Sequence, residues 1–344
     1  MTNPIPNGCG GVAPASQDEP VLALAVRSGF PESRHCGRAV GIGADGATVL
    51  RSGHVGDPVF PRSANKPMQA AAMLACGLDL DGKLLALAAA SHSGERFHVA
   101  GVREILAGAG LDESALACPP ALPLDETCAG DVLRSGGAPE RITNNCSGKH
   151  AAMVATCVAA GWPVAGYRDP QHPLQMVIRE TLQRLAGETV AATGVDGCGA
   201  PLFAITVEGV ARALRALVLA APGTPERRVA DAMRAHPEWT SGTRRPERAL
   251  MTALPGLLVK AGAEGVEAFA FADGRAGAVK IADGARRAVT PVIVALLRAL
   301  GIEGDAAADG DERRADGSPL DALAASPVLG GGAQVGEVRA VWPV

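Results

Sequence analysis

Hydrophobic residues along this chain recur with two different periods. A period of two, typical of strands, is seen in "VLALAVRSG" at 21–29 and in "RAVGIGADGATVLRSG" at 38–53, where Gly and Asp mark the turns. The segment 202–207 predicts a further strand, and alternation about two Gly-rich turns over 265–284 predicts a late antiparallel hairpin.

Longer segments show the spacing of helices. The clearest is 172–187, which is amphipathic and has Pro173 near its start. Helices are expected over residues 68–78, 82–90, after Glu95, and over 151–161, 172–187, 225–239 and 286–301.

This order of elements predicts the fold class. A strand pair comes first and a hairpin last, with mostly helices between them, which favours an α+β fold (an α/β-type sandwich) with a helical insertion. No linker interrupts the middle of the chain, so residues 20–344 are expected to form a single composite domain. Residues 1–19 are expected to be a flexible N-terminal tail, and the polar stretch 305–319 an exposed loop.

Composition excludes several classes of protein. The chain has 344 residues, is 47% hydrophobic and 3% aromatic, and carries a net charge of −4 without a basic block, so no nucleic acid partner is expected. The longest apolar run is broken by Pro291 and Arg298, so no membrane span is expected. No secretion signal is visible, which predicts a cytoplasmic protein whose eight scattered cysteines are reduced.

Lysine is rare in this chain. Of 32 basic residues only five are lysine, at positions 66, 83, 149, 260 and 280. A chain that uses arginine for plain positive charge has reason to keep lysine where an amine must lose its proton, which a guanidinium cannot do. The alternative for any single lysine is chance retention.

Two lysines lie in motifs typical of serine amidases. In "RSANKP", Ser63 and Lys66 have the S-x-x-K spacing, which places a hydroxyl near a helix N-terminus and an amine on the same face. In "VKAGAEG", Lys260 ends a strand ahead of a glycine, as in K-[TS]-G elements, and this glycine is expected to let a substrate approach the backbone. The alternative readings are a capping serine and surface lysines.

Polar residues also follow the apolar run "LLALAAA". The segment "SHSGE" places Ser91 and His92 where a buried element ends, which suits the floor of a polar site. An ordinary helix cap, with Glu95 in the first turn, explains the same residues equally well.

The third set contains thiols. In "NNCSGKHAAM", Cys146 and Lys149 are three residues apart and share one face of a helical turn. In "VDGCGAP", Asp196 and Cys198 lie in a Gly-rich turn. Two thiolates with a nitrogen or a carboxylate are a reasonable zinc set, whereas two unrelated buried thiols are the simpler alternative.

Together these motifs resemble the L-asparaginase II family, the Ser-Lys, zinc-containing class of asparaginases. "SHSGE", "NNCSGKHAAM", "DGCGAP", "VKAGAEGV" and "VKIADG" stand here in the family's order, and the match runs from about Val21 to about Leu300. The "FPRS" sequence before Lys66 and the acidic loop at 305–319 are this chain's own.

The resemblance implies a fold like that of serine β-lactamases and glutaminases, and hydrolysis of L-asparagine. It implies that Ser63 pairs with Lys66 and that Ser91 pairs with Lys260. Zinc (Zn²⁺) ligands would be Cys146, Lys149 and Cys198. Substrate-binding residues would be Arg62, His92, Asn145, His150 and Asp196, and a homodimer is expected.

Two alternatives remain. One is a related amidohydrolase such as a glutaminase, because no motif reads the length of the substrate side chain. The other is a catalytically inactive, zinc-stabilised binding protein, against which the intact serines and lysines argue.

Overall fold

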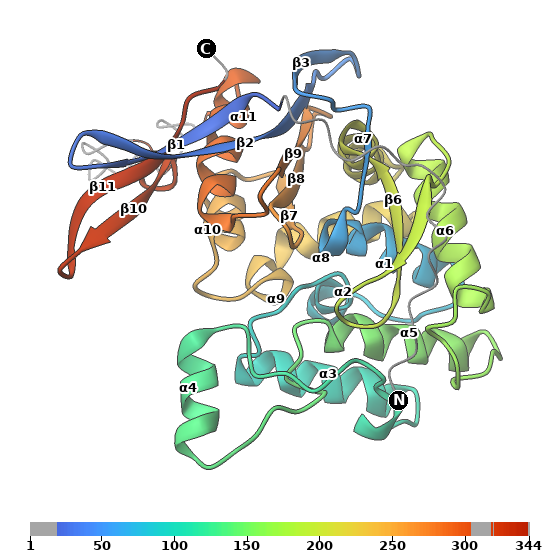
Figure 1. The fold of residues 1–344 in the computed structure, drawn as a ribbon. Helices are drawn as coiled ribbons and strands as arrows, with labels where there is room; N and C mark the ends of the chain where they lie inside the picture. Colours follow the sequence, from blue (N-terminus) through green and yellow to red (C-terminus); the bar gives the residue numbers. More distant parts are fainter. Residues whose placement is uncertain (1–18, 304–317, 319, 343–344) are drawn as a thin grey trace, which may run out of the picture.

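The computed structural model describes residues 19–303, 318 and 320–342 (Figure 1). Its main feature is a curled antiparallel sheet with the strand order β10-β11-β1-β2-β9-β8-β7, and β3 pairs with β2 beside it. These strands are β1 (Val21–Arg27), β2 (Phe30–Ile42), β3 (Thr48–Ser52), β7 (Leu257–Ala261), β8 (Val266–Phe271), β9 (Ala276–Ile281), β10 (Ala325–Gly330) and β11 (Ala333–Ala340).

Helices cover both faces of this sheet. On one face lie α10 (Pro246–Ala253) and α11 (Val289–Ala299), and on the other α7 (Val207–Leu219) leads into the larger helical part. The alternation along β8 shows why both faces must be covered: Ala268 and Ala270 join the core under α7, whereas Phe269 joins the core under α11. The expected α+β class is confirmed.

The larger helical part contains the remaining helices and a small second sheet. Its helices are α1 (Lys66–Ala75), α2 (Gly82–Ala88), α3 (Arg96–Gly108), α4 (Glu126–Arg134), α5 (Ser147–Ala159), α6 (Pro173–Ala186), α8 (Pro225–Ala235) and α9 (Pro237–Thr240). The second sheet has the order β4-β6-β5, formed by β4 (Pro58–Val59), β6 (Pro201–Thr206) and β5 (Ala192–Val195). Short 3₁₀ turns include η1 (Arg62–Asn65) and η3 (Arg286–Ala288).

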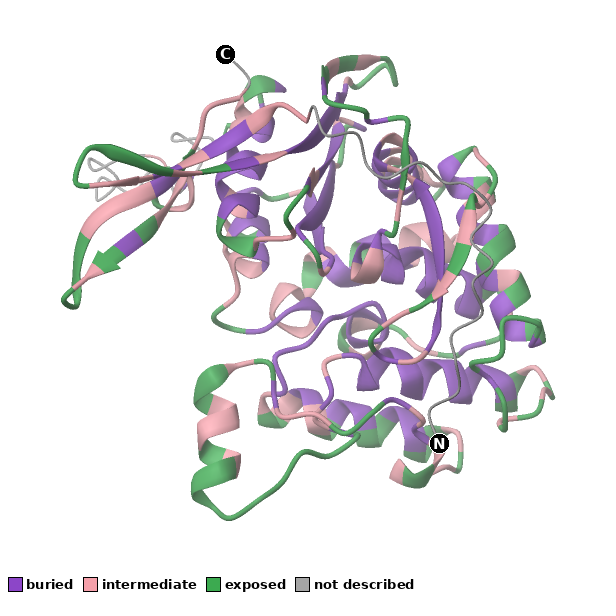
Figure 2. Cartoon of the chain, viewed as in Figure 1, coloured by how far each residue is buried: buried purple, intermediate pink, exposed green. Residues whose placement is uncertain are grey.

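Burial is concentrated where these two parts meet. Figure 2 shows buried residues in the central strands and on the facing sides of the helices, whereas the far ends of β1, β2, β10 and β11 are mostly exposed or half-buried. No helix among the described residues is long and apolar enough to cross a membrane.

Several element boundaries differ from those expected. α5 begins at Ser147 rather than at residue 151, so Lys149 lies inside the helix. The helix expected over 225–239 is interrupted at His236, because Pro237 removes a backbone donor and begins a separate short helix. Most of the expected tail at 1–19 and of the loop at 305–319 lies outside the described residues.

A buried acid–base cluster lies on the α11 side of the sheet. Glu247 on α10 accepts hydrogen bonds from Arg245 and Arg286, both at 3.0 Å. The nearest oxygen of Glu267 on β8 lies 3.8 Å from Arg286, and neither Glu267 oxygen has a hydrogen-bond partner among the residues that the structure describes. Burial, and secondly the neighbouring Glu247, raises the pKa of Glu267 to about 7.

This cluster predicts a pH-dependent effect of Glu267→Gln. A carboxyl group whose pKa is raised on folding stabilises the native state fully below its unfolded pKa of 4.5, and that contribution is lost as pH rises through about 7. The glutamine variant cannot ionise, so its stability relative to wild type is expected to increase from pH 5 to pH 8, by about 1 kcal/mol or more. Urea unfolding at both pH values measures this.

The matched control is Glu337→Gln, which changes an exposed carboxylate of a surface ion pair. Its stability difference from wild type is expected to stay the same at both pH values. A Glu267→Gln difference that does not change with pH would contradict a native-state Glu267 that keeps its proton.

Candidate active site

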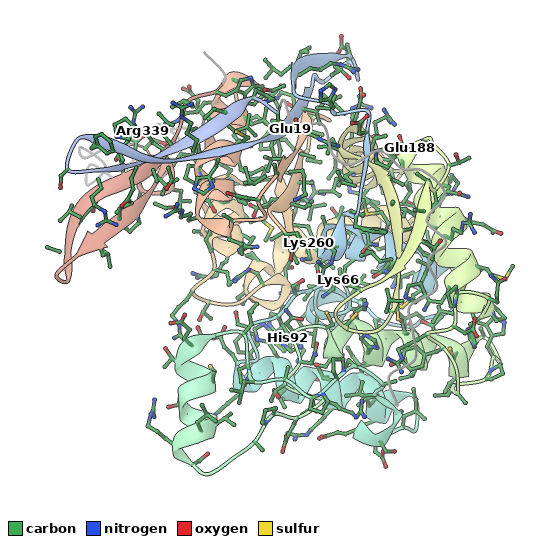
Figure 3. All side chains as sticks on the ribbon, in the orientation of Figure 1. Glu19, Lys66, His92, Glu188, Lys260 and Arg339 are labelled. Carbon is green, nitrogen blue, oxygen red and sulfur yellow. The ribbon has the colours of Figure 1, made fainter. Side chains whose placement is uncertain are left out.

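Two buried lysines converge on one serine hydroxyl. Nζ of Lys66 lies 3.1 Å from Oγ of Ser91, and Nζ of Lys260 lies 2.9 Å from the same oxygen. Each amine is also fixed by a backbone carbonyl, since Lys66 donates to Ala90 at 2.6 Å and Lys260 donates to Ala261 at 2.7 Å. Figure 3 shows both lysines in the middle of the molecule.

The fold brings these residues together from three elements. Lys66 is the first residue of α1, Lys260 lies on the edge strand β7, and Ser91 follows α2. Along β7, Lys260 has the same parity as Leu258, whose side chain packs in the core of the helical part. Lys260 therefore points from the sheet toward α1 and the loop that carries Ser91.

The site favours a neutral amine at Lys260. Burial, and secondly the neighbouring Lys66, lowers the pKa of Lys260 well below 10.5. Two amines on either side of one hydroxyl cannot both be charged without strong repulsion, so one is expected to lose its proton first. A neutral amine within 3 Å of a hydroxyl can accept its proton.

The expected pairing of the serines is only partly what the structure shows. Ser91 contacts Lys260 as expected, but it also contacts Lys66, and no hydrogen bond joins Lys66 to Ser63. Ser63 lies on η1, directly before α1, and its side chain is half-buried. Ser63 and Lys66 are thus neighbours in the sequence, but the hydrogen-bond partner of Lys66 is Ser91, which comes from another element.

The glycine after Lys260 has a packing role that was not expected from the sequence. A Cβ on Gly262 would lie 2.5 Å from the carbonyl oxygen of Pro61, directly before η1. Gly262 therefore lets the turn that carries Ser63 approach β7 closely. This close approach is to the protein's own backbone, and approach of a substrate to the same glycine stays a prediction.

The segment of Ser91 is anchored by its neighbour His92. Nδ1 of His92 accepts from the backbone N–H of Gly94 at 3.1 Å, so Nε2 carries the proton and donates to Ser147 at 2.8 Å. Burial lowers the pKa of His92 well below 6.5, which agrees with a neutral ring. The ring has no exposed surface and positions the segment of Ser91, and its contact with substrate stays a prediction.

The expected metal ligands also come together. Nζ of Lys149 donates to Sγ of Cys198 at 3.1 Å, although the two residues are separated by 49 positions. Cys146 lies next to Cys198, and this neighbour, despite opposing burial, lowers the pKa of Cys146 well below 9.0. Burial disfavours the charged form of Lys149, but Cys198 and Cys146 raise its pKa overall.

The residue types of this donor set suit a metal ion, provided that the metal takes the place of the proton that the neighbouring thiols hold on Lys149. Among the described residues no group of three or more His, Cys, Asp or Glu side chains is placed so that it could hold a metal ion, so a third donor beside the two thiols would have to be another residue type. Lys149 supplies an amine that is almost fully buried, at 2% exposure, beside a thiol of lowered pKa. Thiolate and nitrogen donors are the ligands that zinc prefers.

His150 lies next to this set. Its Nδ1 is 2.6 Å from the hydroxyl of Tyr167, which also accepts from the N–H of Ala117, so the hydroxyl donates to Nδ1. The proton of the neutral ring is then on Nε2, which is buried and has no partner in the described part of the chain. His150 has no exposed surface in this structure, and its contact with substrate stays a prediction.

The other expected substrate residues lie at the edge of the site. Nε of Arg62 donates to Asp196 at 2.7 Å and so ties the turn of Ser63 to the turn of Cys198. Asn145 is half-buried, and its Oδ1 accepts from Cys146 at 3.1 Å. Contact of these three residues with substrate stays a prediction.

A further segment, which the sequence did not predict as part of the site, contacts the turn that carries Ser91. Thr240 accepts from the backbone of Ser91 at 3.2 Å, and Ser241 accepts from the hydroxyl of Ser93 at 2.9 Å. Thr243 donates to Glu95 through both its N–H and its hydroxyl. The only signal in the sequence was "TSGT", a short polar run, which by itself reads as a loop.

The fold and the site indicate a type of chemistry, and a comparison with known proteins shows the family. A mixed α+β protein with paired buried amines at a hydroxyl is suited to proton-transfer chemistry. The family model described as L-asparaginase II matches residues 23–340, and this chain belongs to that family. The family implies an amidohydrolase.

Other comparisons are less specific. The crystal structure described as a "putative beta-lactamase" from Bacteroides dorei DSM 17855 matches with a TM-score of 0.43 and 14% identity, over 76% of this chain and 93% of that chain. At that TM-score the likeness carries no argument, so the serine β-lactamase/glutaminase-like topology stays a prediction. No curated protein matches the sequence.

Proposed function

We propose that this chain is an L-asparaginase, which hydrolyses L-asparagine to L-aspartate and ammonia by Ser-Lys nucleophilic catalysis beside a zinc site. The observation that carries the proposal is the hydroxyl of Ser91 held between the buried amines of Lys66 and Lys260. Membership of the L-asparaginase II family supports the choice of an amide substrate.

In the proposed reaction Ser63 is the nucleophile. Its Oγ bonds to the amide carbon of asparagine while its proton passes to Lys66, and Ser91 relays protons between Lys66 and Lys260. The C–N bond then breaks, and ammonia leaves with a proton returned by the lysine. Water next attacks the acyl group, its proton passes to the amine, and aspartate and the Ser63 hydroxyl are released.

Ser91 is the second candidate nucleophile. Its oxygen is the one within 3.1 Å of both amines, which favours its deprotonation. Against this assignment, Ser91 is only 8% exposed, and its hydroxyl is hydrogen-bonded to both lysines. Ser63 is more exposed and has no hydrogen bond to either amine. An attacking oxygen must reach the substrate, so we favour Ser63.

Cys146, Lys149 and Cys198 would hold the zinc ion. When bound, the metal would orient the substrate and join the turn of Cys198 to α5, since thiolate ligands make zinc a weak Lewis acid. Lys149 is retained in this reading because an arginine cannot supply a neutral amine to a metal.

Ammonia release from L-asparagine and from L-glutamine tests the function, with a sample without substrate as the blank. Hydrolysis of a β-lactam is measured in parallel. Release from asparagine well above that from glutamine supports an asparaginase, and the reverse order supports the glutaminase alternative. No hydrolysis of any of these substrates would favour the inactive binding protein. A cytoplasmic homodimer is part of the same proposal, and light scattering tests the dimer.

Metal analysis tests the zinc site. Protein purified without chelator is expected to hold about one equivalent of zinc, and Cys198→Ser is expected to hold less than about a tenth. Cys76→Ser is the matched control, because Cys76 lies outside the thiol pair and is expected to keep the metal. Fully active wild-type protein with less than about a tenth of an equivalent would rule out the site.

A further inference from the structure

The buried carboxylate of Glu247 lies between two segments of the candidate active site. Glu247 is 2% exposed, and its Oε1 accepts one hydrogen bond from Arg245 and another from Arg286, both at 3.0 Å. Burial opposes the charged form of Glu247, but the two arginines keep its pKa below the usual 4.5, so the carboxylate is ionised. Each arginine connects this charge to a different part of the site.

Arg286 connects Glu247 to the end of β7. The guanidinium of Arg286 also donates to the backbone carbonyl of Gly262 at 3.2 Å. Gly262 directly follows Ala261, whose carbonyl accepts a hydrogen bond from Nζ of Lys260 at 2.7 Å. The bond from Arg286 therefore fixes the backbone that holds the Lys260 amine in place.

On the other side, the 240–245 segment is packed tightly on the Ser91 loop, residues 91–95. The carbonyl of Thr240 accepts from the backbone N–H of Ser91 at 3.2 Å. Gly242 has φ 145°, and a Cβ at this position would collide with Oγ of Ser93. Only glycine allows a backbone to pass so close to a neighbouring side chain in this conformation.

Arg245 joins the 240–245 segment to Glu247. Its backbone N–H donates to the carbonyl of Gly242 at 3.4 Å, and its guanidinium donates to the carboxylate. One carboxylate is thus connected, through one arginine on each side, to the loop that supplies the hydroxyl and to the strand that supplies the amine. The hydrogen bond between Lys260 and Ser91, at 2.9 Å, closes this ring of contacts.

We propose that Glu247 is a positioning residue of the candidate active site, which holds the Ser91 loop and the end of β7 so that the Lys260 amine meets the Ser91 hydroxyl. The inference rests on the proposed function, in which Lys260 and Ser91 exchange protons. In the described part of the chain the side chain of Glu247 bonds only to the two arginines, so it acts through them. The competing explanation is that these buried charges only stabilise the fold.

The charge of Glu247 also acts on the Lys260 amine. Burial, and secondly Lys66, lowers the pKa of Lys260, whereas Glu247 raises it. The other titratable or charged groups that act on this amine are Arg245, Cys146 and Glu267. Loss of the Glu247 charge is therefore expected to lower the pKa of Lys260 further, which a purely structural role does not predict.

Glu247→Gln tests the proposal, because the amide keeps the shape and an acceptor oxygen but removes the charge. In steady-state ammonia release from L-asparagine, kcat is expected to fall about tenfold or more while KM changes less than about threefold. The rise of kcat/KM with pH is expected to move to lower pH by about half a unit or more. Glu247→Asp keeps the charge and is expected to keep the wild-type midpoint.

Arg286→Lys is a second variant, in case Glu247→Gln does not fold. The Arg286 side chain is 39% exposed, and lysine keeps its charge but lacks the planar fork that reaches both Glu247 and Gly262. Its kcat is expected to fall about fivefold or more without a change of midpoint. Hydrogen exchange followed by mass spectrometry, which needs no turnover, is expected to be faster at 91–95 and 257–262 in both variants.

The matched control is Glu188→Gln, which changes a carboxylate bonded to Arg212 and Thr206, away from Lys66 and Lys260 (Figure 3). It is expected to keep the wild-type kcat, pH profile and exchange in both segments. Wild-type kcat in Glu247→Gln, a pH profile that does not move, or unchanged exchange would each overturn the proposal. Faster exchange confined to the two segments, in a protein whose wild type releases no ammonia, would leave the positioning role standing and refute the asparaginase.

Discussion

Lys260→Met is expected to lower kcat/KM for L-asparagine about a thousandfold, because the variant keeps the size of the side chain but removes the amine nearest Ser91. The effect should fall on kcat more than on KM, since proton transfer belongs to the transition state rather than to substrate binding. Steady-state ammonia release at saturating and limiting asparagine measures both.

The pH profile identifies the amine. The pKa of Lys260 is lowered well below 10.5, so kcat/KM of the wild type is expected to rise with pH as the neutral amine accumulates and then to level off. Lys260→Met should lose this rise. Lys83→Met is the control, because Lys83 is half exposed on the surface, and it should keep the full rate and the same profile. A flat wild-type profile from pH 6 to 9 would count against a neutral amine.

Ser63→Ala is expected to abolish turnover and to prevent any acyl-enzyme, with a loss of about 10⁴-fold or more in kcat. The reason is that alanine removes the oxygen proposed to bond to the amide carbon. Wild-type protein is mixed with a slowly hydrolysed ester of the side-chain carboxyl of L-aspartate, and mass spectrometry locates the trapped acyl group. The acyl group should be found on Ser63.

Ser91→Ala separates the two serines. If Ser91 only relays protons between Lys66 and Lys260, this variant is expected to acylate slowly on Ser63, with a loss of about 10²–10³-fold in kcat. An acyl group attached to Ser91 in wild type, together with turnover by Ser63→Ala, would reverse the assignment and make Ser91 the nucleophile. Ser93→Ala is the control, since in the described part of the chain the hydroxyl of Ser93 donates to the backbone of Ser241 and bonds to neither lysine.

The strands and helices near the middle of the sheet could be predicted from the sequence because their burial is regular. Alternation predicted β1, β8 and β9, and each is present. The strands β10 and β11 were missed, because β11 is a strand by virtue of pairing with β1 more than 300 residues earlier, and its burial pattern is weak. Local pattern carries no information about such a partner.

The candidate site was predictable in its residue types but not in its pairing. The scarcity of lysine singled out Lys66, Lys149 and Lys260, and all three are almost fully buried. The expected bond of Lys66 with Ser63 was inferred from spacing along the chain. In the structure Lys66 instead forms its hydrogen bond with Ser91, because α1 and the loop after α2 pack side by side.

The sequence by itself determined the family, the α+β class and the set of chemical groups, since each depends on residue identity and on periods of a few positions. Only the tertiary structure decided which amine meets which hydroxyl, that Gly262 serves a close backbone approach, and that Glu247 meets two arginines. The physical reason is that a contact between distant residues depends on how whole elements pack, and hydrophobic spacing specifies the buried face of an element but not its neighbour.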